Sequence, residues 1–236
     1  MLKFPLFGIP VGVHLTFLFV ALLGATTYSG VDIAIWTVAA FVSILLHEMG
    51  HALTARAFGA QGITVTLYGL GGVTHYRHGE RMTHGRSFWI SAAGSATGIA
   101  AGGALLLAAW TGAFTGVSHE VAVFLDSLIF TALVWGVLNW VPIVPLDGGH
   151  MVQSLASMVS EEKGPLISQI ITWITVAIVV PLALINDFTF AAIIVVVFAF
   201  SGLREYRTRA AAKRPAPQVP PTTQPESREP PPEFPI

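Results

Sequence analysis

The chain contains no cysteine and few charged residues, and both absences exclude whole classes of protein. Without cysteine there are no disulfides and no thiolate metal sites. Only 11% of the 236 residues are charged and 53% are hydrophobic, whereas a soluble domain carries about 25% charged residues. The net charge of −1 gives no electrostatic support for binding nucleic acid. This composition predicts an all-α polytopic membrane protein.

Six apolar stretches are long enough to cross a membrane, which takes about 20 residues. With six spans, all twelve Lys and Arg residues fall on the side of the N-terminus. The positive-inside rule then predicts a multi-pass protein of the cell membrane (inner or plasma membrane) with both termini in the cytoplasm. Pro5 and Pro10 interrupt the approach to the first stretch, which favours a membrane helix over a cleaved signal peptide. The predicted spans are residues 12–29, 33–57, 88–111, 121–142, 165–185 and 187–205.

Two segments outside the spans have their own character. Residues 63–76 contain two alternating runs around glycines, which predicts a small cytoplasm-facing β-hairpin. Residues 206–236 are rich in proline and lack apolar periodicity, which predicts a disordered tail after a core of residues 1–205.

In the third span, Gly94, Gly98 and Gly102 recur every four residues and predict a smooth face for helix packing.

The second span carries the pattern HEMGH, which is typical of zinc hydrolases. His47 and His51 are four residues apart, so on a helix they share one face and can bind one metal ion. Glu48 lies about 100° round the helix and could act as a general base on the attacking water. Ionisable side chains in a membrane span each cost at least about 2.5 kcal/mol. They therefore predict a functional site more strongly than a cluster that only holds helices together.

A catalytic zinc ion takes a third protein ligand, and few acidic residues lie near the spans. Asp126 is early in the fourth span, on the outer side, while Asp147 follows that span on the cytoplasmic side, toward which His47 lies. Pro142 and Pro145 break the helix before Asp147. Such a break is tolerated at membrane depth only where protein or a wet cavity covers it. The sequence therefore favours Asp147 over Asp126.

HEMGH in one span and NWVPIVPLDGG after a later one resemble the site-2 protease family of intramembrane zinc metalloproteases. The resemblance implies one zinc ion per chain held by His47, His51 and Asp147, with Glu48 catalytic. It also implies hydrolysis of peptide bonds in or near transmembrane segments of membrane-bound signalling proteins. Asn139 matches the family's asparagine, which either binds the substrate or satisfies the helix break. Family members often show AGPxxN in the third span, where this chain has AGSATG, so the polar role of that stretch is not carried over.

The predicted partners are single-span membrane substrates and membrane lipid, and a homodimer is an open alternative. The predicted hairpin could hold an unwound substrate by β-addition, with Thr66 and Val73 in the binding strand; an ordinary interfacial loop is the other interpretation. A zinc-binding transporter or scaffold is the competing class, because broken helices with buried ionisable residues also suit transporters. We find no internal repeat of the kind transporters often carry.

Overall fold

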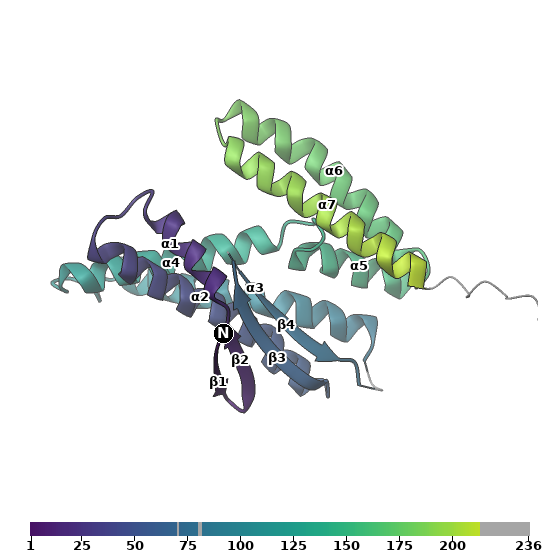
Figure 1. Ribbon diagram of the computed structural model, residues 1–236, viewed down its shortest axis with the longest axis horizontal. Coiled ribbons are helices and arrows are strands. Elements are labelled where there is room, and N and C mark those ends of the chain that lie inside the picture. The colour runs from purple at the N-terminus through teal and green to yellow at the C-terminus, as the bar shows by residue number, and fades with distance from the viewer. Residues whose placement is uncertain (70, 80–81, 213–236) are drawn as a thin grey trace, which may run out of the picture.

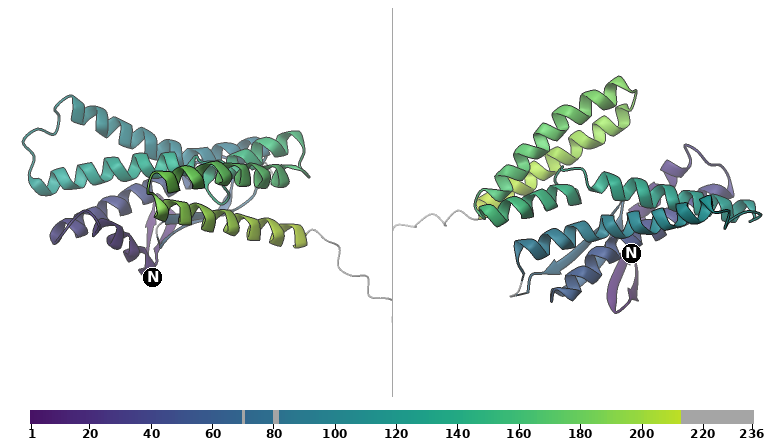
Figure 2. Two further views of the ribbon diagram at one scale, coloured as in Figure 1. Left: turned by 90° about the horizontal axis from the view of Figure 1, so that it is seen from above. Right: turned by 180° about the vertical axis from the view of Figure 1, so that it is seen from behind.

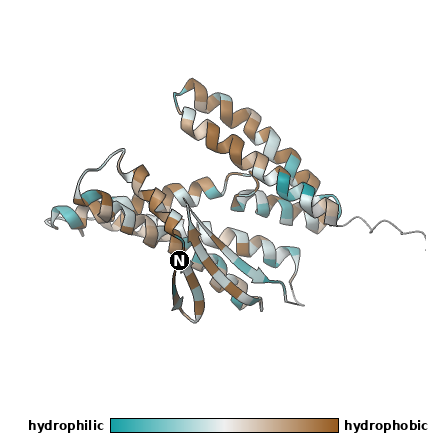
Figure 3. Cartoon of the chain, in the orientation of Figure 1, coloured by the Kyte–Doolittle hydropathy of each residue, from teal (hydrophilic) through white to brown (hydrophobic). Residues whose placement is uncertain are grey.

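The computed structural model describes residues 1–69, 71–79 and 82–212. Within these residues, five helices are long and apolar enough to cross a membrane. They are α2 (Val31–Ala57), α3 (His84–Trp110), α4 (His119–Asn139), α6 (Gly164–Ile185) and α7 (Thr189–Ala212). Their large exposed side chains are mostly apolar, and Figure 3 shows apolar colour along most of α6 and α7. The chain is therefore a multi-pass membrane protein, as its composition predicts.

The first predicted span, residues 12–29, is wrong as a single membrane helix. The chain begins with strands β1 (Leu2–Leu6) and β2 (Ile9–Val13), followed by a 3₁₀ helix, η1 (Leu15–Leu18), and the short helix α1 (Phe19–Gly24). The helical part, Leu15–Gly24, is shorter than a span requires. Apolar content misled the prediction. Only Gly12 and Val13 of this stretch belong to β2, and the rest forms two short helices and a turn, with Phe17 and Val20 buried in the protein.

A four-stranded sheet in the order β1-β2-β3-β4 lies beside the C-terminal half of α2 (Figure 1). The predicted hairpin is present as β3 (Gln61–Tyr68) and β4 (Gly71–Arg77), paired antiparallel. The N-terminal hairpin extends it through parallel pairing of β2 with β3. This pairing holds the N-terminal hairpin against the connection between α2 and α3. Side chains of β2, β3, α1 and α2 share the largest apolar cluster of the molecule.

The glycine face predicted on α3 packs inside the bundle. A side chain added at Gly98 would come within 3.2 Å of the Ala132 carbonyl oxygen, and one at Gly102 within 2.9 Å of Leu133. Both neighbours belong to α4, so small residues let these two helices approach closely. The third glycine of the face, Gly94, meets α2 instead, at the site described below.

Beyond α4 the chain breaks and then turns into a second helical unit. α4 ends at Asn139 instead of residue 142, and an unpredicted helix, α5 (Asp147–Val159), follows the break. α5 buries Gly148, Gly149, Ser154 and Ser157 and exposes Leu155, Met158 and Val159. Its exposed face is therefore apolar and its buried face small and polar, the reverse of a helix in a soluble protein.

α6 and α7 form an antiparallel hairpin that packs on α5 and leans away from α2, α3 and α4 (Figures 1 and 2). Ile143 in the break is buried against Val176 of α6 and Ala199 of α7. α7 stays helical beyond the core boundary predicted at residue 205. The remainder of the predicted tail, from residue 213, lies outside the described residues.

Candidate metal centre

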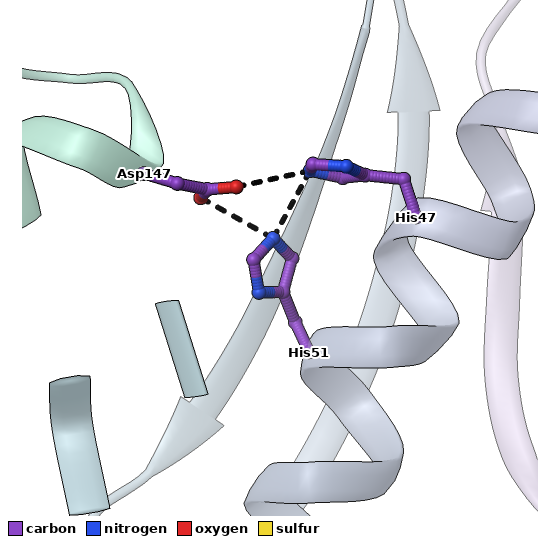
Figure 4. A group of neighbouring side chains, drawn as sticks. All are labelled: His47, His51 and Asp147. Atoms are coloured by element: carbon purple, nitrogen blue, oxygen red, sulfur yellow. Dashed lines mark hydrogen bonds and ion pairs between the residues drawn. The ribbon is translucent and has the colours of Figure 1, made fainter. Parts of the chain in front are cut away.

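The HEMGH turn lies in the middle of α2, and its ionisable side chains point into protein. His47, Glu48 and His51 have exposed fractions of 5%, 5% and 8%. Such burial is rare for ionisable groups unless they are paired or bind a metal. The helical spacing puts both imidazole rings toward the chain break after α4, as the sequence predicts (Figure 4).

Asp147 reaches this turn from the first residue of α5. Its Oδ2 atom lies 3.2 Å from Nε2 of His47, and its Oδ1 atom lies 3.3 Å from Nε2 of His51 (Figure 4). The two Nε2 atoms are 3.1 Å apart. Within the described part of the chain, these three residues are the one group of His, Asp and Glu side chains placed to hold a metal ion.

The hydrogen bond on the far side of His51 shows which of its ring nitrogens is a ligand. Nδ1 of His51 lies 2.7 Å from the carbonyl oxygen of Ile90. A carbonyl oxygen only accepts, so Nδ1 carries the proton and the neutral ring has its lone pair on Nε2. That lone pair faces His47 and the Asp147 carboxylate. Several acceptor atoms thus converge on one point, an arrangement that a bound metal ion would satisfy.

Two imidazoles and one carboxylate match the donor set of a catalytic zinc site, which leaves a position for water. In such sites a ligating histidine commonly donates its other ring N–H to a carbonyl or carboxylate, which orients the ring, and the Ile90 carbonyl does this for His51. His47 differs, because its buried Nδ1 atom has no hydrogen-bond partner within the described residues.

Gly94 of α3 gives the His51 ring its space. A side-chain carbon at this position would lie 2.2 Å from Nε2 of His51, far inside van der Waals contact. The face predicted for helix packing alone therefore also shapes the metal centre.

Glu48 is held by the edge strand of the sheet, β4. Among the described residues, no hydrogen bond or ion pair joins its side chain to His47, His51 or Asp147. The Thr74 hydroxyl donates to Oε2 of Glu48 at 2.7 Å. A side chain at Gly72 would come within 2.8 Å of Oε1, so glycine at this position leaves room for the carboxylate. Sequence reasoning missed both residues, although the alternation of β4 places Gly72 and Thr74 on the same face.

The remaining predicted site residues lie elsewhere around this turn. Asn139 is the last residue of α4, and its side-chain nitrogen donates to the Trp135 carbonyl of its own helix at 2.9 Å. Thr66 and Val73 are cross-strand partners in β3 and β4. The hairpin offers one edge strand, β4 with Val73, whereas Thr66 lies on β3, which runs between β2 and β4. The N-terminal strands that cover β3 were not recognised from sequence.

Sequence reasoning also missed Ser95, which stands where the family often has proline. Its hydroxyl is completely buried and donates to Oδ2 of Asp147 at 2.9 Å. From the sequence, the departure from the family pattern puts a polar role of this stretch in doubt, whereas in the structure the serine contacts a candidate ligand.

Comparison with known proteins also finds zinc metalloproteases. Residues 113–182 match the model of peptidase family M50. Zinc metalloprotease MJ0392 of Methanocaldococcus jannaschii is 27% identical over 157 residues, which cover 65% of this chain and 44% of that protein. "Putative zinc metalloprotease Rip3" of Mycobacterium tuberculosis is 36% identical over 115 residues, which cover 48% of this chain and 28% of that one. The chain thus spans less than half the length of these curated relatives.

The fold matches a solved structure. The site-2 protease from Methanocaldococcus jannaschii superposes with a TM-score of 0.64 at 24% identity, covering 87% of this chain and 94% of the other. The resemblance seen in HEMGH and in the Asp147 motif is therefore confirmed: the chain has the fold of a site-2 protease and carries a match to peptidase family M50.

Proposed function

We propose that this chain is an intramembrane zinc metalloprotease that hydrolyses peptide bonds in or near transmembrane segments. The observation that carries the proposal is the convergence of buried His47, His51 and Asp147 beside Glu48, in the middle of a membrane-length helix. The names of the relatives, all zinc metalloproteases, support it.

His47, His51 and Asp147 would hold the zinc ion. When bound, zinc supplies a Lewis acid that polarises the scissile carbonyl and acidifies water at the site. Glu48 then takes a proton from the attacking water and delivers it to the leaving amine nitrogen. Because Thr74 fixes Oε2 of Glu48, the other carboxylate oxygen is the one available for this transfer. Burial of the whole group keeps bulk water out and strengthens each of these electrostatic contacts.

The substrate class follows from the depth of the site. A transmembrane helix satisfies its own amides, so a bond to be cleaved must first leave the helix and expose unpaired polar groups in lipid. β4 is an edge strand of the sheet, and its Thr74 touches Glu48. We place the unwound substrate as a further strand on β4, beside Val73, with Asn139 on the opposite side of the cleavage position. Single-span membrane signalling proteins fit this mode.

Strand addition is tested by crosslinking. With a substrate trapped by Glu48→Gln, cysteine at Val73 should crosslink to residues flanking the scissile bond. Cysteine at Thr66, on the inner strand, is the matched control and should crosslink less. Crosslinks from Asn139 alone would contradict strand addition and leave the chain break after α4 as the only substrate contact.

We propose that both termini lie in the cytoplasm of a cell whose inner or plasma membrane holds the protein, on the same side as the basic residues. The described residues contain five long apolar helices where the charge partition assumed six spans, so this orientation requires the chain between β2 and α2 to cross as well. The β2–β3 pairing supports this, since it ties the N-terminus to the same end as the basic connection between α2 and α3. Single cysteines at Ser118 and Asn186 should react with an impermeant reagent from outside, and one at His84 only from the cytoplasm. External labelling at His84 would overturn the orientation.

The direct test of the function compares membranes containing wild-type protein with membranes containing Glu48→Gln. Single-span proteins that accumulate uncleaved in the variant are the expected result, and they would identify the substrates. A zinc-binding transporter or scaffold has no need of a general base. Identical membrane proteomes, combined with intact zinc binding in both proteins, would therefore favour that class and contradict proteolysis.

A further inference from the structure

Three buried hydroxyl groups surround the segment that carries Asp147. One is Ser95 on α3; the other two, Ser168 and Thr172, are four residues apart on α6 and so lie on one helix face. Their exposed fractions are 0%, 1% and 0%. All three contact a single short stretch of chain, residues 144–149.

The contacts fall on both sides of Asp147 and on its side chain. The backbone N–H of Val144, three residues before it, donates to the Thr172 hydroxyl at 3.1 Å. The Ser168 hydroxyl donates to the carbonyl of Gly149, two residues after it, at 2.8 Å. The Ser95 hydroxyl donates to Oδ2 of the carboxylate itself at 2.9 Å. Asp147 is thus held through its backbone by α6 and through its side chain by α3.

These contacts meet a need created by the chain break. Residues 140–146 are not helical, so their backbone groups lack the partners that a helix supplies. At membrane depth such groups must be satisfied by protein or by water in a cavity. The Thr172 hydroxyl does this for Val144 in the break, and the Ser168 hydroxyl holds Gly149 in the first turn of α5. Together with the burial of Ile143, these bonds help to fix the carboxylate relative to the two histidines on α2.

We propose that Ser95, Ser168 and Thr172 are positioning residues for Asp147, and that they set the affinity of the metal centre without touching the metal. The proposal rests on the proposed function, in which Asp147 is a zinc ligand. Loss of outer-shell partners of metal ligands costs roughly 10–100-fold in metal affinity. We expect a change of that size for each of Ser95→Ala and Thr172→Val.

The test measures the zinc dissociation constant and the zinc release rate of the purified full chain by competition with a chromogenic chelator. Ser95→Ala and Thr172→Val should both bind zinc more weakly and release it faster. Thr172→Ser keeps the hydroxyl and should restore near wild-type values, which a role in packing alone would not predict. The melting temperature of the zinc-free proteins reports whether the variants are folded.

Two hydroxyls on α4 provide matched controls. Among the described residues, the side chain of Ser127, as buried as that of Ser95, bonds only to Tyr28. The buried side chain of Thr131 bonds, within the same residues, only to its own helix. Ser127→Ala and Thr131→Val should leave zinc release unchanged. Wild-type zinc affinity in both Ser95→Ala and Thr172→Val would overturn the positioning proposal and leave the proposed function standing. Absence of zinc from the wild-type protein itself would instead defeat the proposed function.

Discussion

The two parts of the molecule that meet at the metal centre are built in different ways. α2, α3, α4 and the sheet form a close-packed unit, in which one unbroken helix supplies His47, Glu48 and His51. The second part, residues 140–212, supplies Asp147 from the end of a broken chain. Its α6–α7 hairpin packs on α5 and leans away from the bundle (Figure 1). One part therefore offers a preformed pair of ligands, and the other delivers the third.

This difference predicts different consequences for substitutions on the two sides. Changes in the bundle act on ligand or base geometry directly, because helix spacing fixes those side chains. Substitutions around the break act indirectly, by shifting the segment of chain that carries Asp147. Glu48 is a special case, since it lies in the bundle and contacts the sheet instead of the second part.

The largest expected effect comes from Glu48→Gln. Glutamine fills the same volume but cannot accept the proton, and loss of a general base costs about 10²–10⁴ in rate. The zinc content should stay at the wild-type value because Glu48 is not among the three converging ligands. Cleavage assays paired with metal analysis check this. Wild-type turnover in Glu48→Gln would exclude the mechanism, and loss of zinc would make Glu48 a ligand.

Gly94→Ala should come next. The added methyl group would overlap the His51 ring, so the ring must turn away and most of the zinc should be lost. Gly103 lies on the same helix with nothing near its missing side chain, and Gly103→Ala is the matched control. Alanine favours a helix by about 1 kcal/mol over glycine, so helix propensity predicts no loss of helix stability in either variant. Equal zinc contents in the two variants would contradict the geometry of α2 against α3.

A smaller effect is expected from Thr74→Val, which frees Oε2 of Glu48 while keeping the side-chain shape. Hydrogen bonds to charged groups contribute about 1.5–3 kcal/mol, so the cleavage rate should fall by roughly 10–100-fold at unchanged zinc content. Thr66 is the matched control because it has no contact with Glu48 among the described hydrogen bonds. A Thr74→Val enzyme as active as Thr66→Val would show that the sheet does not hold the base.

Sequence reasoning succeeded where local spacing determines geometry. HEMGH places His47 and His51 on one face whatever surrounds the helix. The hairpin of β3 and β4 is likewise predicted by neighbouring residues alone, because two runs of alternating residues flank glycines. Sequence reasoning failed where long-range pairing decides. The strand Ile9–Val13 carries no local strand signal of its own, and its pairing with β3 joins segments about fifty residues apart. The contact of Ser95 with Asp147 joins residues 52 apart in sequence, and no pattern within either segment predicts it.

A metal ion held between the two parts of the molecule is tested most directly by the zinc content of the purified protein. Wild-type protein should hold about one zinc ion per chain, with His47 and His51 from one part and Asp147 from the other as its ligands. Asp147→Ala should lose most of the zinc even though both histidines remain in place on α2. Full retention of zinc by Asp147→Ala would contradict a centre shared between the two parts.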